Sequence, residues 1–183
     1  MNPKRHGGRR NPRPETPETG EAARRIQTDY RRNRSGDSVG SRLIAIAPVL
    51  LVDTNVIAPL YVRSARSHSV AELFARDAVW RTEPLALIEL SNVLVSYERA
   101  GYVTAARSRD CLRRAAAFLQ PHLFRVSHEA ALDTALRYRV TAYDARFLAA
   151  AQQLGRRLVT EDARLRAAAP GLTQSLAEAL AST

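Results

Sequence analysis

Residues 49–56, Val-Leu-Leu-Val-Asp-Thr-Asn-Val, decide the fold of this chain. The four apolar residues before Asp53 are typical of a short strand buried on both faces, as in a parallel sheet. The strand ends at Asp53, and a short helix is predicted from Asn55 to about Val62. A carboxylate directly after a buried strand is either a turn residue or part of a polar site at the edge of the sheet.

Strands and helices alternate from this point to the C-terminus. Further strands are predicted at 78–81, 123–126 and 157–160, with a last edge strand at 172–176. The predicted helices lie at 69–76, 84–100, 104–120, 128–138 and 142–154, with a short helical turn after Asp162. This alternation predicts an α/β fold with a parallel sheet that has helices on both faces. Ligands of such sheets bind beyond the carboxyl ends of the strands.

Several residues mark the ends of the predicted helices. Ser69 and Glu72 have the spacing of a capping box, in which each side chain bonds the backbone of the other residue. Thr141 is predicted to cap the helix that begins at Ala142. Gly101 and Gly155 follow the last apolar residues of their helices, where glycine is favoured because it adopts a left-handed backbone.

The first 41 residues are predicted to form a disordered basic tail, and the folded domain is predicted at 48–183. Residues 1–47 contain eleven Lys or Arg and five Asp or Glu, so they hold +6 of the formal net charge of +10. The tail contains Pro, Gly, Arg and Glu and almost nothing to bury. Three explanations stay open: an arm that attracts RNA, a solvated tail without a function, or a gene start placed too far upstream.

The composition suggests a soluble cytoplasmic protein. Cys111 is the only cysteine, so no intramolecular disulfide can form, which indicates a reducing compartment. The longest apolar run, residues 43–52, is too short for the roughly 20 residues that cross a bilayer. Lys4 is the only lysine, so the positive charge is nearly all arginine, a residue that binds phosphate with two parallel hydrogen bonds.

Four carboxylates are the candidate functional residues: Asp53, Glu89, Asp144 and Asp162. Asp53 and Asp162 follow two predicted strands, while Glu89 and Asp144 lie early in predicted helices that start near the same edge. Taken singly, each is explained by a turn, a helix cap or a solvated face. Gathered at one edge they would repel each other, and a divalent cation would relieve that repulsion.

Oxygen ligands alone select hard cations, here Mg²⁺ or Mn²⁺. Such an ion orients a water, lowers its pKa and neutralises charge on a phosphate, so no nucleophilic side chain is needed. The four histidines do not have the spacing of metal ligands, and Cys111 has no obvious partner. The residues therefore favour metal-dependent cleavage of phosphodiesters.

The surroundings of these carboxylates resemble the four motifs of PIN-domain ribonucleases. The matching stretches are Val52-Asp53-Thr54-Asn55-Val56, the segment 86–94 around Glu89, Thr141-Ala142-Tyr143-Asp144-Ala145 with 148–151, and the segment 158–165 around Asp162. The resemblance covers residues 48 to about 180. Size and the third motif look most like VapC toxins of bacterial toxin–antitoxin pairs.

The resemblance implies a three-layer α/β/α sandwich and Mg²⁺-dependent endoribonuclease activity. It implies that Asp53, Glu89, Asp144 and Asp162 bind the metal and act in catalysis. It also implies supporting roles for Asn55, which would orient the loop of Asp53, and for the hydroxyl of Thr160. Glu161 departs from a simple match, because it offers a possible extra ligand beside Asp162. A homodimer and a VapB-like antitoxin are the implied protein partners, and RNA is the implied substrate.

Two other functions stay open at this point. The first is a PIN-domain nuclease in RNA processing, without a toxin role, whose basic tail helps to capture RNA. The second is a non-enzymatic binding or phospho-acceptor module, which the absence of lysine from the folded part disfavours. Arginines near the motifs are candidate RNA contacts by position alone: Arg63, Arg66, Arg146 and Arg164.

Overall fold

A computed structural model describes residues 49–182, and the predicted tail lies outside this range. The centre is a four-stranded sheet in the order β2-β1-β3-β4, with every neighbouring pair parallel. The strands are short: β1 (Leu50–Val52), β2 (Trp80–Arg81), β3 (Leu158–Val159) and β4 (Thr173–Gln174). Because β1 and β3 are central neighbours, their carboxyl ends meet at one edge of the sheet.

Helices fill the connections between the strands. The chain runs from β1 through α2 (Thr54–Ile57), the 3-10 turn η1 (Ala58–Leu60) and α3 (Ser67–Arg76) to β2. The long connection from β2 to β3 contains α4 (Leu85–Arg99), α5 (Ala105–Leu119), η2 (Gln120–His122), α6 (His128–Tyr138) and α7 (Ala142–Leu154). The segment α8 (Ala163–Ala168) joins β3 to β4, and α9 (Leu176–Ala181) follows β4.

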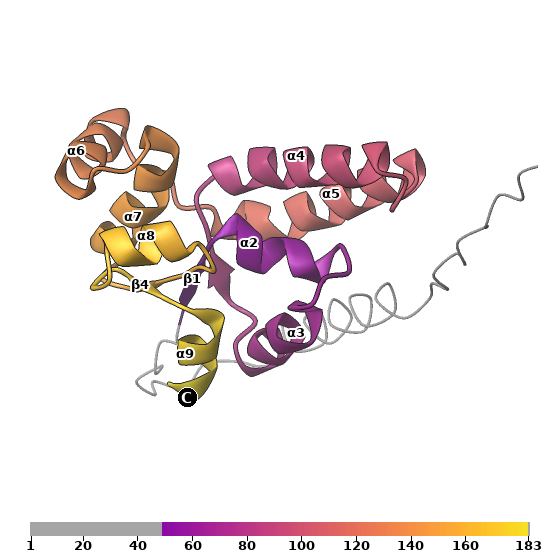
Figure 1. Ribbon diagram of the computed structural model, residues 1–183, viewed down its shortest axis with the longest axis horizontal. Helices are drawn as coiled ribbons and strands as arrows, with labels where there is room; N and C mark the ends of the chain where they lie inside the picture. Colours follow the sequence, from indigo (N-terminus) through magenta and orange to yellow (C-terminus); the bar gives the residue numbers. More distant parts are fainter. Residues whose placement is uncertain (1–48, 183) are drawn as a thin grey trace, which may run out of the picture.

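The helices lie on both sides of the sheet, which confirms the predicted α/β architecture. Figure 1 shows α4 and α5 as an antiparallel pair to one side, with α6, α7 and α8 grouped on the other and α3 and α9 below. The buried core joins the strands to these helices through Leu51, Val52, Trp80, Leu90 and Leu158. Burying apolar area of this kind is the main favourable term in folding.

The helix α7 is the most deeply buried of the helices that surround the site. Its consecutive residues from Phe147 to Ala151 are all buried. Three of them are alanines, whose small side chains let the helix backbone approach β3 closely. This packing fixes the position of the first turn of α7, where Asp144 lies.

The predicted helix ends are largely confirmed. Thr141 caps α7 by accepting a hydrogen bond from the backbone of Asp144, and Thr104 caps α5 in the same way. Gly101 and Gly155 both have positive φ, at 75° and 60°. These helix ends could therefore be predicted from the local sequence.

Three local predictions were wrong or incomplete. The capping box at Ser69 and Glu72 does not form, because α3 already begins at Ser67, whose hydroxyl donates to the carbonyl of Pro59, and Glu72 pairs with Arg76. The strand predicted at 123–126 is reduced to one bridge between Thr82 and Leu123. The helix α9 was missed, although Ser175 and Glu178 form a true capping box at its start.

None of the helices within residues 49–182 is long and apolar enough to cross a membrane.

We predict that Gly155→Ala costs about 1 kcal/mol of unfolding free energy, because alanine disfavours the left-handed backbone that ends α7. Gly171→Ala is the matched control, since Gly171 has no positive φ and open space around its Cα. Chemical denaturation of both variants checks the difference. Equal stability of the two variants would contradict the assigned helix end.

Candidate active site

The site is built on the ends of the two central strands. The backbone N–H of Asp53 donates to the carbonyl of Val159 at 3.0 Å, which continues the ladder between β1 and β3. One step further, the hydroxyl of Thr160 donates to Asp53 Oδ2 at 2.5 Å. Thr160 is fully buried, and Asp53 is 7% exposed. The carboxylate of Asp53 is therefore held at the sheet edge by the neighbouring strand.

Asn55 ties the loops after the two strands together. Its amide nitrogen donates to Asp53 Oδ2 at 2.7 Å and to Thr160 Oγ1 at 3.1 Å. Its amide oxygen accepts from the backbone N–H of Glu161 at 3.0 Å. Asn55 thus lies where the sequence suggested, in direct contact with Asp53.

Glu89 reaches this cluster through a residue that the sequence did not reveal. The hydroxyl of Thr54 donates to Glu89 Oε2, while the backbone N–H of Thr54 donates to Asp53 Oδ1 at 2.5 Å. Thr54 is buried and bridges two of the four predicted carboxylates. Its position between Asp53 and Asn55 was the only sequence signal, because a hydroxyl residue at a helix start is common.

Asp144 and Asp162 both have the helix-cap contacts that offered the simpler explanation. Asp144 Oδ2 accepts from the hydroxyl of Thr141 at 2.7 Å. Asp162 Oδ1 accepts from the backbone N–H groups of Arg164 at 2.8 Å and Leu165 at 3.0 Å, so Asp162 caps α8. In addition, the backbone N–H of Asp162 donates to Thr160 Oγ1 at 3.1 Å, which places Asp162 beside the Asp53 network.

The four carboxylates act on each other electrostatically. Burial is the main cause that raises the pKa of Asp53, and the charges of Asp162 and Asp144 raise it further, against the hydrogen bonds from Thr160 and Thr54. Burial likewise raises the pKa of Glu89, with added contributions from Asp53 and Asp144 and an opposing hydrogen bond from Thr54. Segments remote in the chain therefore bring the four side chains into one region.

Glu161 lies differently from its neighbour Asp162. Its Oε1 accepts from the backbone N–H of Leu176 at 2.8 Å, and its Oε2 lies 3.4 Å from Arg66 Nε. Arg166 Nη1 lies 3.8 Å from Glu161 Oε1. These contacts direct the carboxylate toward the start of α9, so Asp162 is the better placed of the two acids.

The donor set suits a partly hydrated hard cation. One oxygen of each of Glu89, Asp144 and Asp162 accepts no hydrogen bond from residues 49–182. Within the same range, no three His, Cys, Asp or Glu side chains are close enough to hold one ion jointly. Mg²⁺ usually keeps several waters and binds one or two carboxylates directly. The all-oxygen chemistry of the donor set therefore fits such an ion.

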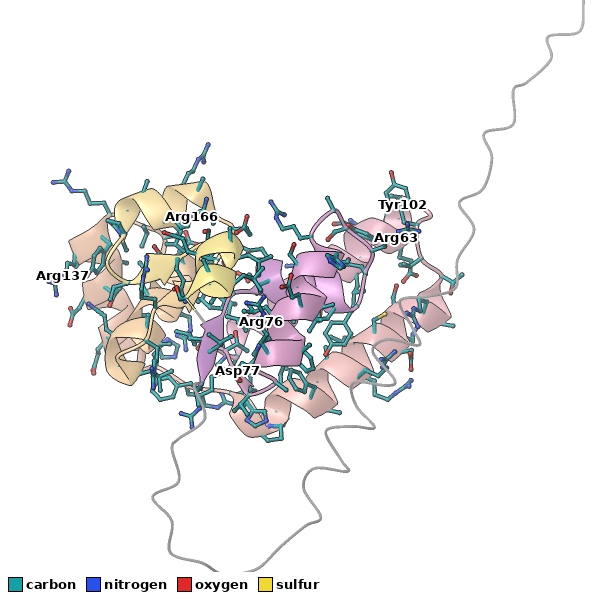
Figure 2. The ribbon with its side chains drawn as sticks, turned by 90° about the horizontal axis from the view of Figure 1, so that it is seen from below. Arg63, Arg76, Asp77, Tyr102, Arg137 and Arg166 are labelled. Atoms are coloured by element: carbon teal, nitrogen blue, oxygen red, sulfur yellow. The ribbon has the colours of Figure 1, made fainter. Side chains whose placement is uncertain are left out.

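The candidate RNA contacts among the arginines divide into two groups. Arg146 is largely covered and pairs with the fully buried Glu83. Arg63, Arg66 and Arg164 are exposed. Figure 2 shows Arg63 and Arg137 at opposite ends of the molecule. Exposed positive charge is therefore spread out and does not by itself locate a path for RNA.

We predict that Thr160→Val costs about 1–3 kcal/mol of unfolding free energy, because it leaves the buried polar groups of Asp53 and Asn55 with one partner fewer. Thr173→Val is the matched control: this buried threonine in β4 donates one hydrogen bond, to the carbonyl of Ala169. Denaturant titration should give the larger loss for Thr160→Val. A smaller loss than in the control would show that the Thr160 network contributes little.

A second prediction concerns the charge of Glu89. Its pKa is raised in the folded chain, so its ionisation lowers the stability as the pH rises through the folded-state pKa. Glu89→Gln removes this cost and keeps an oxygen that can accept from Thr54. In EDTA, the variant should melt above wild type at neutral pH, and the two should converge below the ordinary pKa of 4.5. A gap that widens toward acid pH would contradict the prediction.

Comparison with known proteins places these residues in a family. A family model for the PIN domain matches residues 50–170. Ribonuclease VapC3 of Pyrobaculum aerophilum is 31% identical over 126 residues, which cover 67% of this chain and 96% of that protein. The crystal structure of PAE2754 from Pyrobaculum aerophilum matches with a TM-score of 0.56 at 21% identity, covering 74% of this chain and 97% of that one.

The structural likeness supports the same fold, and the sequence matches extend across the strands and helices that carry all four carboxylates. The chain therefore belongs to the PIN-domain family and resembles its VapC-type members.

Proposed function

We propose that this protein is an endoribonuclease that hydrolyses RNA phosphodiesters with the help of Mg²⁺, or of Mn²⁺ in its place. The main supporting observation is geometric: Asp53 and Glu89 are joined through Thr54 at the end of β1, and Asp162 is joined to Asp53 through Thr160 at the end of β3. Such a cluster is costly for the fold alone, and perturbed carboxylates gathered at one place are typical of functional sites. The name and similarity of Ribonuclease VapC3 support RNA as the substrate.

In this proposal the four carboxylates hold the cation, directly or through water. The ion supplies the activation of a water and the neutralisation of charge on the phosphate and the leaving oxygen. Thr54 and Thr160 hold the carboxylates of Glu89 and Asp53 in place by hydrogen bonds. Asn55 keeps the two strand-end loops at a constant separation.

We further propose that the protein is the toxin of a toxin–antitoxin pair, with a VapB-like antitoxin and a second copy of the chain as partners. The similarity to a VapC protein supports this role. Large apolar side chains are exposed on α4, α6 and α7, including Ile88, Leu132, Leu136 and Tyr143, as expected for a surface that a protein partner covers.

The activity is tested with a labelled single-stranded RNA, with Mg²⁺ and with EDTA. We predict that Asp53→Ala and Asp144→Asn each lower the cleavage rate by at least about 100-fold, because removing a ligand should cost more than the 10–100-fold typical of the residues that support ligands. EDTA should abolish cleavage by wild type. Circular dichroism should show that both variants remain folded.

Asp77→Asn is the matched control. Burial raises the pKa of Asp77 as it does for Asp53, but the acids of the site do not contribute to the shift of Asp77. Asp77 also accepts a hydrogen bond from the backbone of Val79 that asparagine can keep. The control should cut RNA at the wild-type rate. Full activity of Asp53→Ala, or cleavage that persists in EDTA, would refute the proposed function.

A further inference from the structure

A buried ion pair links two of the segments that carry the site. Glu83 lies between β2 and α4, two residues after the end of β2, and is fully buried. Its Oε1 accepts from Arg146 Nε at 2.8 Å and from Arg146 Nη2 at 2.5 Å. Its Oε2 accepts from the backbone N–H of Leu85 at 2.6 Å. Both carboxylate oxygens are thus occupied, one by the first turn of α4 and the other by α7.

The guanidinium of Arg146 also reaches the segment between η2 and α6. Its Nη2 donates to the carbonyl of Val126 at 3.2 Å, and its Nη1 lies 3.4 Å from His128 Nδ1. Only 19% of the Arg146 side chain is exposed. One side chain therefore joins α7 to the start of α4 and to the start of α6.

The place of this pair in the chain connects it to the carboxylates. Arg146 lies in α7 two residues after Asp144, and Glu83 lies two residues before the start of α4, the helix that carries Glu89. The contact from Arg146 to Glu83 consequently joins the N-terminal part of α7 to the start of α4. The relative placement of these two helices sets the distance between Asp144 and Glu89.

Stability alone does not explain a buried pair of this kind. Removing two charges from water is costly, and apolar side chains of similar volume are often equally stable or more so. The pair adds a defined relative orientation of the two segments, because the planar guanidinium donates its hydrogen bonds in fixed directions. Leaving Glu83 unpaired would in addition place a fifth free carboxylate near the site, since its charge already acts on Glu89.

We propose that Glu83 and Arg146 are positioning residues that join the start of α4 to α7 and so fix the placement of Glu89 relative to Asp144, two of the proposed ligands of the cation. This inference rests on the proposed function, because it concerns the same cation. Neither residue needs to contact the ion or the RNA.

The test uses the full chain and Mn²⁺ as the probe, with binding measured by electron paramagnetic resonance of the free ion. The double variant Glu83→Gln/Arg146→Met removes the ion pair and leaves the net charge unchanged, so a change in affinity cannot come from altered long-range charge. We expect Mn²⁺ to bind roughly 10- to 100-fold more weakly than to wild type, as for other residues that orient metal ligands.

Two single variants serve as controls. Arg164→Met removes an exposed arginine that lies two residues after Asp162, the same offset that Arg146 has from Asp144. It should change the Mn²⁺ affinity by no more than about twofold, because solvent screens the interaction between the exposed charge of Arg164 and the ion. Val70→Ala weakens the core at a buried residue of α3 and controls for a general loss of stability.

Hydrogen exchange provides a readout that does not depend on the metal. In the double variant, backbone amides in the first turns of α4 and α7 should exchange faster than in Val70→Ala at equal global stability. If the double variant does not fold, Arg146→Lys takes its place, because lysine keeps the charge but not the forked geometry. It should bind Mn²⁺ at least about threefold more weakly than wild type.

The outcomes separate the two proposals. Mn²⁺ affinity within about twofold of wild type in the double variant, or in Arg146→Lys if that replaces it, would overturn the positioning role while leaving the proposed function intact. A wild-type chain that binds no Mn²⁺ would instead refute the proposed function. Weaker binding in the double variant, with both controls near wild type, would support the positioning role.

Discussion

Repulsion between carboxylates at the ends of β1 and β3 is the constraint on which the rest of the site depends. Asp53 is buried at that edge, and Asp162, Asp144 and Glu89 act on it or on one another from three other segments. A fold that keeps such charges together must hold them against their mutual repulsion. Hydrogen bonds from Thr54, Asn55 and Thr160 do this within the strand-end loops.

The parallel sheet explains why these segments meet. Because β1 and β3 are adjacent and parallel, Asp53 and Thr160, which directly follow them, lie at the same edge of the sheet. Glu89 and Asp144 come from the helices α4 and α7, which lie apart in the fold (Figure 1). The central strands hold one end of the network, and the Glu83–Arg146 pair joins the two helices that hold the other.

Much of this arrangement could be predicted from local sequence. The apolar run before Asp53, the cap at Thr141, the helix start at Thr104 and the glycines at 101 and 155 each have a local physical cause, and each was recognised. The strand at 123–126 was overestimated because apolar composition does not report whether a partner strand continues beside it. The capping box at Ser69 failed because α3 starts earlier, at Ser67, whose hydroxyl donates to the carbonyl of Pro59 in the preceding turn.

The site shows the same division between local and long-range information. The four carboxylates were found because each lies at a recognisable strand end or helix start. Thr54 and the Glu83–Arg146 pair were not found, because their partners lie 35 and 63 residues away and no spacing rule connects them. Arg146 was predicted only as a candidate RNA contact, because an arginine next to a motif gives no sign of a buried acid 63 residues away.

The most direct test of the central claim is a crystal structure of the protein soaked in Mn²⁺, with anomalous scattering recorded at the manganese edge. We predict an anomalous peak at the carboxyl ends of β1 and β3, among Asp53, Glu89, Asp144 and Asp162. A peak bound elsewhere, or no peak there at saturating Mn²⁺, would contradict the claim that these four side chains share one cation.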